Sequence, residues 1–397
     1  MIGLRLESET PLFLGGYDTN FDPNDPFRAQ SLKGLWRYWL RAYIAGAMHE
    51  AGLLRCEKGK TTVCDIKNEE LDFLRKKTEN ILGGLGSASK FRLIVDETKS
   101  TEYGMEQKVR VAPRFKLLTL GGRRPTYGRV YAKIRVEKAP HVKHLNENEV
   151  KLALGSLLTA LSLNGLGKMG RRGFGTFSIK FDEPGIFSRF LKGEELDLEK
   201  IGELINETLN AARSYIEKEG KGHGIPPMDC VSRVKLDLSD VQGSSKLFSK
   251  EAPVFAVIRA KSRKSALDQV IDLQNFFYRP GRGKVLGFMI TDADRSRDLL
   301  VRNRLSWFLG LPRSQRNTGY MDTDRRAGPI HLAVHEAGAF FTVFLSGDWP
   351  RKLRWRGYRE KPLEIDFNDI KNAYLASISL LENYLERLGY SYEVIYP

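Results

Sequence analysis

Eleven residues in the first half of the chain decide how its fold is interpreted: Gly165-Leu166-Gly167-Lys168-Met169-Gly170-Arg171-Arg172-Gly173-Phe174-Gly175. The run contains five glycines, three basic residues and no acidic residue. Before it, leucines recur at helical spacing and predict a helix from about Asn148 to Leu163. After it, residues 176–181 alternate apolar and polar side chains as a half-buried strand does. The predicted order is therefore helix, loop, strand.

This order limits the ligands that the loop could hold. Residues Gly165–Gly170 match the G-x-G-x-x-G pattern of dinucleotide-binding loops. Those loops leave a strand and open a helix, whose N-terminus holds the pyrophosphate, so the match is rejected here. A P-loop is excluded as well, because Arg171 and Arg172 stand where Lys and Ser or Thr are required. No nucleotide cofactor is expected at the loop.

The composition of the loop instead suits a phosphodiester chain. Glycine lets backbone amides approach a ligand closely and form an anion-holding concavity. Arginine adds a planar fork that fits phosphate oxygens or stacks on a base. We therefore predict RNA contacts at seven loop positions: Gly165, Gly167, Lys168, Gly170, Arg171, Arg172 and Gly173. The alternative is a flexible connection that happens to be basic.

The loop closes a β-α-β-β-α-β order in the first half of the chain. A strand from Ile2 to about Leu6, a helix from about Ser31 and strands at residues 91–95 and 130–136 precede the second helix. This is the order of a ferredoxin-like unit. The second half repeats it more loosely, with strands at 253–258, 330–334, 339–345 and 392–396 and helices at 265–277 and 369–388. The predicted fold class is α+β, with two tandem ferredoxin-like (RRM-like) domains.

A break between the two domains is predicted where glycines alternate with other residues and two prolines follow, at residues 220–227. We predict an N-terminal domain over residues 1–185, a connecting helical segment over 186–229 and a C-terminal domain over 230–397. The glycine-rich loop precedes the last strand of the first domain.

The charge of the chain indicates an anionic partner. Its 397 residues include 64 Lys and Arg against 49 Asp and Glu, a formal net charge of +15. Nucleic acid or an acidic membrane surface would fit such a surplus. No stretch approaches the ~18 apolar residues of a spanning helix, and residues 1–7 alternate like a strand rather than forming a signal-peptide core. We therefore expect nucleic acid and no membrane.

Three cysteines, Cys56, Cys64 and Cys230, form no C-x-x-C pair and give an odd count. They predict neither a disulfide framework nor a zinc site, and they suit a reducing cytoplasm. A metal held by Cys56 and Cys64 would need ligands from elsewhere, because no histidine lies nearby at ligand spacing.

The first helix carries a basic row beside an apolar stripe. Ser31 is a suitable N-cap, and the apolar residues that follow recur on one helical face: Leu32, Leu35, Trp36, Trp39, Leu40 and Tyr43. Lys33, Arg37 and Arg41 follow one another at intervals of four. Such a row is usually a solvated face. In a ferredoxin-like unit, however, this helix and the glycine-rich loop could line one basic groove.

Residues 27–42, FRAQSLKGLWRYWLRA, and the glycine–arginine loop resemble the hallmarks of RAMP proteins, RNA-binding subunits of CRISPR systems. The first-helix pattern is most similar to the first Cmr subunit of type III-B effector complexes. Residues 83–89 and 325–329 are similar to further segments of that subunit. The resemblance implies two ferredoxin-like folds and binding of CRISPR RNA or single-stranded target RNA. It also implies a place beside other RAMP subunits at the end of a cytoplasmic Cmr complex that silences foreign RNA in antiviral defence.

This resemblance extends the predicted contacts to the first helix, where Arg28, Lys33, Arg37 and Arg41 would touch RNA. The arginine run of the loop is short, only Arg171-Arg172, which implies fewer phosphate contacts there. The second half adds further basic candidates: Arg282, Lys284, Arg325, Arg326, Arg354, Trp355 and Arg356. Bases interleaved with aromatic residues suit phosphate contacts combined with base stacking. A solvated rim or contact with an acidic protein patch are the alternatives.

No catalytic residue is predicted. His331 and His335 would face one side of a strand, where a pair of histidines could bind metal or act on RNA. However, His335-Glu336-Ala337-Gly338 is not H-E-x-x-H, and that zinc motif needs a helix. The sequence contains no nucleophile elbow and no acidic cluster suited to two-metal chemistry. In the complex that the chain resembles, target cleavage belongs to a different subunit.

Three functions remain open from the sequence. The first is a non-catalytic RNA-binding subunit. The second is a metal-independent RNA-processing endonuclease that depends on His331 or His335. The third is a structural capping subunit with little RNA affinity of its own, whose basic patches meet acidic partner surfaces.

Overall fold

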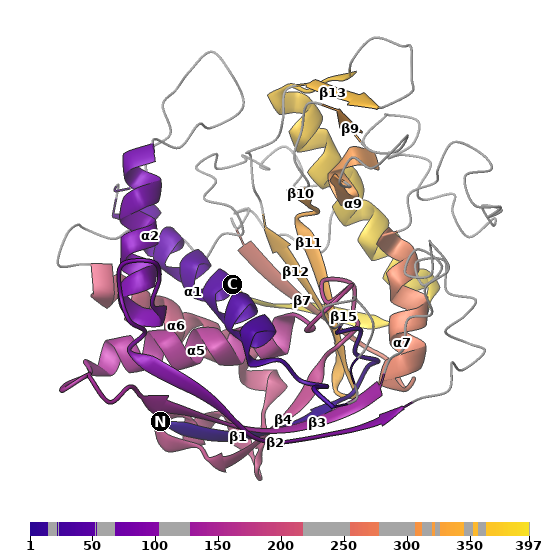
Figure 1. The fold of residues 1–397 in the computed structure, drawn as a ribbon. Helices are drawn as coiled ribbons and strands as arrows, with labels where there is room; N and C mark the ends of the chain where they lie inside the picture. The colour runs from indigo at the N-terminus through magenta and orange to yellow at the C-terminus, as the bar shows by residue number, and fades with distance from the viewer. Residues whose placement is uncertain are drawn as a thin grey trace.

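The computed structural model describes residues 1–14, 22, 24–51, 53, 68–102, 128–216, 255–277, 306–311, 320–321, 326–344, 352–355 and 363–396. Within this part of the chain, the two largest of four antiparallel sheets alternate with two groups of helices (Figure 1). Helices α1, α5 and α6 lie between the sheets, and α7 and α9 cover the far face of the second sheet.

The first sheet consists of β1 (Ile2–Ser8), β2 (Phe91–Glu102), β3 (Gly128–Lys138), β4 (Phe177–Glu183), β5 (Leu191–Lys192) and β6 (Glu195–Leu196). Its strands run antiparallel in the order β2-β3-β1-β4-β6-β5. Leu4 of β1 lies opposite Ile134 of β3 and Phe181 of β4, and all three side chains are buried. Period-two alternation thus turns one face towards the helices and the other outwards.

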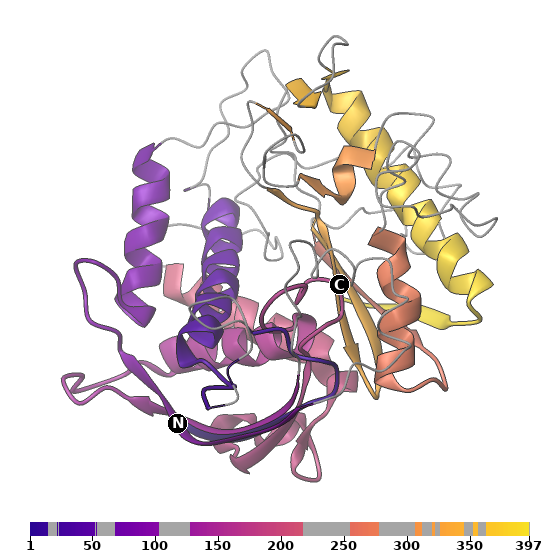
Figure 2. The ribbon, with the colours of Figure 1, turned by 45° about the vertical axis from the view of Figure 1, so that its right-hand side comes forward.

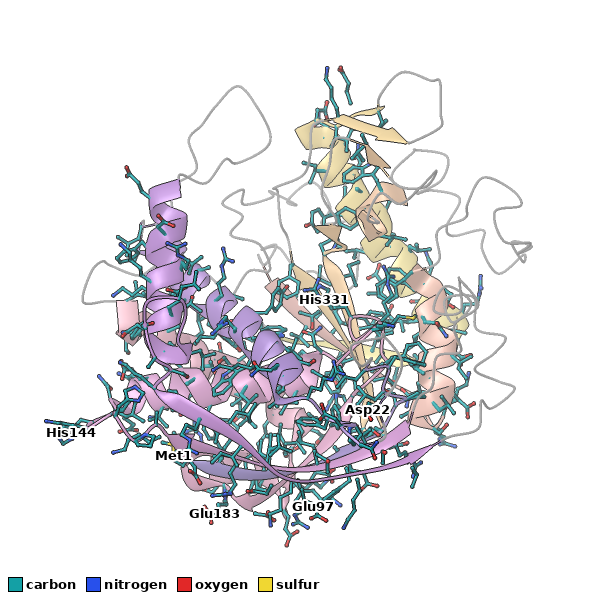
Figure 3. All side chains as sticks on the ribbon, in the orientation of Figure 1. Met1, Asp22, Glu97, His144, Glu183 and His331 are labelled. Carbon is teal, nitrogen blue, oxygen red and sulfur yellow. The ribbon has the colours of Figure 1, made fainter. Side chains whose placement is uncertain are left out.

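Charged side chains cover the outward face of this sheet and pair with one another. Arg5 Nε lies 2.7 Å from Asp182 Oδ1, and Lys133 Nζ lies 3.0 Å from Asp182 Oδ2. Arg135 donates to both carboxylate oxygens of Asp96, at 2.7 and 2.8 Å. Figure 3 shows Glu97 and Glu183 pointing away from the helices on the same face. Arg5, Lys133 and Arg135 on this face are therefore matched by acidic neighbours.

Four helices belong with this sheet: α1 (Ala29–Glu50), α2 (Asn68–Leu82), α5 (Glu147–Leu163) and α6 (Ile201–Ile216). The predicted stripe of α1 faces the core, and Trp36 Nε1 donates to the carbonyl oxygen of Ala153 on α5 at 2.6 Å. Ser31 is not the N-cap that the sequence suggested, because α1 begins at Ala29 and the Arg28 carbonyl accepts the amides of Ser31 and Leu32.

The segment after β4 packs into the first core. It forms η1 (Gly185–Phe190), β5, β6, η2 (Leu198–Lys200) and α6. Gly155 of α5 makes this packing close, since a Cβ there would lie 2.1 Å from Thr208 Oγ1 of α6. The predicted division into 1–185, 186–229 and 230–397 stays a prediction, although α6 is continuous with the first core.

The second sheet consists of β7 (Phe255–Lys261), β11 (Ile330–His335), β12 (Gly338–Phe344) and β15 (Ser391–Tyr396), antiparallel in the order β11-β12-β7-β15. Its helices are α7 (Ala266–Leu273) and α9 (Phe367–Arg387). Every residue of β11 and β12 is buried, because α5 packs on one face of these strands and α7 packs on the other face.

Short elements complete the described part of the second half: η4 (Gln274–Phe277), η6 (Ser306–Leu309), β8 (Gly310–Leu311), β9 (Tyr320–Met321), β10 (Arg326–Ala327), β13 (Lys352–Trp355) and β14 (Leu363–Glu364). The predicted α+β class with antiparallel sheets is confirmed. Among the described helices, none combines the length and apolar character needed to cross a bilayer.

Candidate nucleic-acid interface

The glycine-rich loop joins the two halves of the molecule. It leaves α5, enters β4 and lies beside the strands of the second sheet (Figure 2). Lys168 N donates to the Phe13 carbonyl at 2.9 Å, which ties the loop to the segment after β1. Gly173 N donates to the Leu332 carbonyl at 2.8 Å, and Leu332 N donates to the Arg171 carbonyl at 3.0 Å. The loop backbone thus extends the edge of β11.

Close packing between the loop and its neighbours explains why glycine occupies these positions. Gly173 has a φ of +87°, and a Cβ there would lie 2.6 Å from Val270 Cγ2 and 3.0 Å from Val334 Cγ2. At Gly165 a Cβ would lie only 1.7 Å from the Phe174 carbonyl oxygen. Both positions need glycine for tight internal packing and not for the approach of a ligand.

The anion-holding concavity expected from the loop amides is not formed by most of them. Seven loop amides donate to carbonyl oxygens of the protein: Gly165, Leu166, Lys168, Gly170, Arg172, Gly173 and Gly175. An amide already engaged in this way is not available to a phosphate oxygen. The expectation failed because sequence composition cannot distinguish glycines that serve a ligand from glycines that serve a chain junction.

The side chains of the loop point in different directions. Arg171 is exposed, and its guanidinium carbon lies 4.9 Å from the ring centre of Tyr38 on α1. Lys168 is also exposed. The loop and α1 therefore meet, as the sequence suggested, but the contact is made by Tyr38 beside the predicted basic row.

Arg172 faces inwards to the second half. Its guanidinium carbon lies 4.6 Å from the ring centre of Phe277, and Nη2 donates to the Leu309 carbonyl at 3.2 Å. Two adjacent arginines thus divide their roles. Arg171 offers a charge at the surface, while Arg172 helps to join the halves.

The basic row of α1 is divided as well. Arg37 Nη2 donates to the carbonyl oxygens of Leu82, at 3.0 Å, and Gly83, at 2.8 Å. A cation at the C-terminal end of α2 is favoured by the helix dipole, so Arg37 fixes the turn that follows α2. Arg28 lies 3.6 Å from Asp25, Lys33 is half-buried, and Arg41 is exposed.

The candidates of the second half are less fully placed. Arg326 lies in β10, and Arg354 and Trp355 lie in β13, with only their backbone described. Arg282, Lys284, Arg325 and Arg356 lie outside the described residues. The same holds for Cys56, Cys64 and Cys230. In the described part of the chain, no group of three His, Cys, Asp or Glu side chains could hold a metal ion.

His331 and His335 face the same side of β11, as predicted, and both contact the end of α5. Trp39 Nε1 donates to Asn164 Oδ1 at 2.6 Å, which orients the amide so that Asn164 Nδ2 donates to His331 Nδ1 at 3.4 Å. Only 1% of His331 is exposed, and burial, followed by the charges of Arg171 and Arg172, holds its pKa well below the ordinary value. This histidine is therefore a neutral part of the core.

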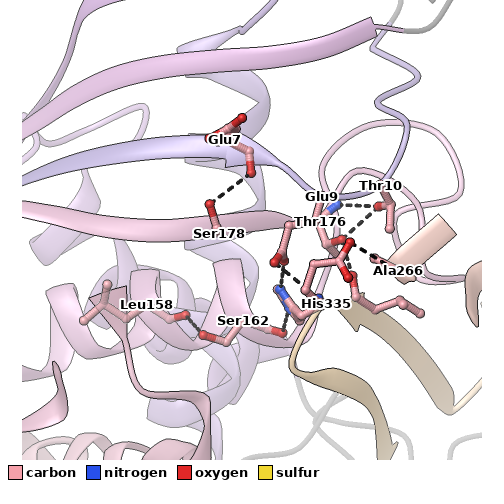
Figure 4. A network of polar contacts seen from close by, with 11 residues as sticks. Glu7, Glu9, Thr10, Leu158, Ser162, Thr176, Ser178, Ala266 and His335 are labelled. Carbon is pink, nitrogen blue, oxygen red and sulfur yellow. Dashed lines mark hydrogen bonds and ion pairs between the residues drawn. The ribbon is translucent and has the colours of Figure 1, made fainter. Parts of the chain in front are cut away.

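His335, in contrast to His331, is positively charged. Its Nδ1 donates to Glu9 Oε2 at 2.6 Å and its Nε2 donates to the Ser162 carbonyl at 2.8 Å (Figure 4). Both partners are acceptors, so both ring nitrogens carry protons and the ring is an imidazolium. Burial alone would lower the pKa of His335, but the charge and hydrogen bond of Glu9 and the Ser162 carbonyl raise it above its ordinary value.

This pair makes the stability of the molecule depend on pH. Since the pKa of His335 is raised by folding, its contribution is fully present below about pH 6.5 and is lost as pH rises through the raised pKa. We expect the free energy of unfolding of the unmodified chain to fall between about pH 6 and pH 9 by more than that of a Glu9→Gln variant. Urea unfolding at several pH values measures both, and parallel curves would contradict a charged pair.

Neither Glu9 nor Asn164 lies in a recognisable motif, so their part in this junction could not be predicted from the sequence. Tyr38 could have been found from the sequence, because it is an aromatic residue next to the basic row of α1. Its contact with Arg171 is set by the course of the loop, which only the structure shows.

Residues 5–178 match the model of the RAMP superfamily. No curated protein sequence matches the chain. The crystal structure of apo Cmr1 from Pyrococcus furiosus is similar over 100% of this chain and 99% of that one, with 16% identity and a TM-score of 0.52.

A chain of type III-B Cmr-beta, determined by cryo-electron microscopy with cognate target RNA and AMPPnP bound, is similar over 97% of this chain and 99% of that one. Its identity is 12% and its TM-score is 0.55. A second Cmr-beta structure with cognate target RNA gives 12% identity and a TM-score of 0.51, over 96% and 99% of the two chains. These likenesses show a shared fold. The family-model match over residues 5–178 and these structural likenesses confirm the resemblance seen in the sequence.

Proposed function

We propose that the chain is a non-catalytic RNA-binding subunit of a type III-B CRISPR effector complex, in contact with guide or target RNA and with other RAMP subunits. The observation that carries the proposal is the pair of exposed basic side chains, Lys168 and Arg171, on a loop fixed beside α1. The stacking of Arg171 on Tyr38 holds the guanidinium plane in place. A planar guanidinium so held can contact phosphate or stack on a base.

The outer face of the first sheet is less suited to RNA binding than the edge formed by the loop and α1. RRM-type proteins stack bases on aromatic residues of that face. Here the face carries ion pairs such as Arg5 with Asp182, whose opposite charges already neutralise each other. The edge formed by the loop and α1 is therefore favoured. The strand orders β2-β3-β1-β4 and β11-β12-β7-β15 support our inference that each sheet belongs to a ferredoxin-like unit.

The geometry of the histidines supports a non-catalytic role. A general acid or base must come within hydrogen-bond reach of its substrate. His331 and His335 are 1% and 0% exposed, and both ring nitrogens of His335 are engaged. The endonuclease alternative would require them to leave the core.

Replacement of Arg171 by Ala is expected to weaken the binding of single-stranded RNA by about fivefold to tenfold across sequences. It should also reduce the log–log dependence of affinity on salt by ~0.7, the value of one phosphate contact on a single strand. Fluorescence anisotropy with labelled oligonucleotides over a salt series measures both quantities.

Lys192→Ala is the matched control. Lys192 is exposed on β5, and β5 and β2 are the two edge strands of the first sheet. It should leave affinity and salt dependence close to those of the unmodified chain. Unchanged binding in Arg171→Ala would remove the loop from the proposal. Absence of any binding at low salt would favour the structural capping subunit instead.

A further inference from the structure

The two large sheets have four edge strands, and β2 differs from the other three. β5 has only 2 residues, and β11 is bonded along its edge to the glycine-rich loop. β15 lies against α6, where a Cβ at Gly202 would be 2.3 Å from the Ile395 carbonyl oxygen. β2 runs for 12 residues, and in the described ranges only β3 pairs with it (Figure 1). Unpaired amide and carbonyl groups along an edge strand are a template for another strand.

A bulge at Asp96 divides β2 into two parts. After the bulge, Glu97 and Lys99 form an ion pair on the strand. Bulges and charged side chains are means by which proteins protect a sheet edge from pairing with another chain. The part of β2 from Glu97 onwards is therefore protected, whereas the part before the bulge is not.

The unprotected part, residues 91–95, has the sequence Phe-Arg-Leu-Ile-Val. Leu93 and Val95 are half-buried against the first core, whereas Ile94 is half-buried on the outer face of the sheet, opposite Arg135 of β3. Aliphatic side chains of this kind fit a pleated, half-buried surface. A further strand beside residues 91–95 would increase the burial of all three aliphatic side chains.

This stretch is complementary to itself when two copies run antiparallel with Ile94 at the centre. Ile94 then lies opposite Ile94 of the partner subunit, and Leu93 lies opposite Val95 of the partner subunit. Arg92 lies opposite Asp96 of the partner subunit, so that apolar residues meet apolar ones and unlike charges meet. Arg92 is exposed, and it forms no ion pair with any residue that the structure describes. Asp96 already accepts two hydrogen bonds from β3, and a carboxylate has lone pairs left for a second guanidinium.

We propose that two copies of this chain associate through residues 91–95 of β2, antiparallel about Ile94, so that their first sheets join into one. The same patch serves on both subunits, so the contact closes at a dimer. β3 and β1 separate β2 from β4, the strand that follows the glycine-rich loop, so this surface is distinct from the edge proposed for RNA. Five-residue strands make a small interface, and we expect a dissociation constant on the order of 10 µM.

Sedimentation velocity of the full chain over a concentration series measures the association. We expect the dimer fraction to rise with concentration, and Ile94→Lys to weaken dimerisation about tenfold or more, because two like charges would face each other across the dimer axis. Thr101→Lys is the matched control. Thr101 is exposed beyond the bulge of the same strand, and it lies opposite Arg129 as Ile94 lies opposite Arg135. This control should dimerise as the unmodified chain does, and thermal unfolding checks that both variants fold.

Ile94→Cys tests the register of the pairing. Thiols opposite each other in an antiparallel pair are close enough to form a disulfide, so mild oxidation should link two chains at position 94, as peptide mapping would show. Thr101→Cys should give no such link. A chain that stays monomeric throughout the series, a dimer that Ile94→Lys leaves intact, or a dimer that does not link at position 94 would overturn the proposal. Arg171→Ala should dimerise normally while binding RNA less tightly, so this proposal and the proposed function can fail independently.

Discussion

Glu9→Gln is expected to lower the free energy of unfolding by about 3 kcal/mol near pH 6.5. Glu9 lies after β1 and His335 at the end of β11, 326 residues apart in sequence, and His335 is buried while Glu9 is half-buried between the two halves. The variant leaves the His335 imidazolium beside a neutral amide. It also removes one of the two oxygens that serve His335 Nδ1 and Glu336 N. Chemical denaturation followed by circular dichroism measures the loss.

Glu7→Gln is the control for this prediction. Glu7 is two residues earlier, on β1, and its side chain is exposed. A neutral amide there should change the free energy of unfolding by less than about 0.5 kcal/mol. Equal effects at the two positions would mean that the His335 contact contributes little.

Gly173→Ala is expected to cost about 3 kcal/mol of stability and to loosen the loop from β11. Two causes add up at this position. The φ of +87° disfavours any side chain by about 1 kcal/mol or more, and the added Cβ meets Val270 and Val334 in the second core. Because the loop backbone pairs with Leu332, displacement of Gly173 also disturbs that pairing. Unfolding by urea measures the stability, and hydrogen exchange of the Leu332 amide reports the pairing.

Gly193→Ala separates the two causes. Gly193 also has a positive φ, +66°, but a Cβ there would meet nothing within 4 Å. Its replacement should therefore cost only the conformational part, about 1 kcal/mol. If both variants lost the same stability, close packing at Gly173 would not be the reason for the glycine.

Local patterns predicted much of the first half. The helix, loop and strand around residues 165–175, the buried stripe of α1 and the placement of His331 and His335 on one side of a strand all follow from short-range periodicity. The start of α1 was misplaced by two residues, because the sequence favoured Ser31 as a cap while the Arg28 carbonyl begins the helix.

The position of the candidate site could be predicted from the sequence, but the contacts of its residues could not. Composition identified a basic loop, yet it could not show that most loop amides bond internally or that Arg172 turns towards Phe277. Gly173 bonds to Leu332 and Arg172 contacts Phe277, and both partners lie more than 100 positions away along the chain. Contacts of that range leave no periodic mark in a single sequence.

The helical layer between the sheets has a mechanical consequence. α5 packs on β4 below it and on β11 and β12 above it, and Trp39 of α1 lies 5.8 Å, centre to centre, from Phe344 of β12. Opening the two halves would expose these apolar surfaces to water, at a cost that rises with every residue uncovered. The described part of the molecule is thus built as a rigid block and not as a clamp. A strand of RNA would have to conform to its surface, because hinge closure is not available at low energy.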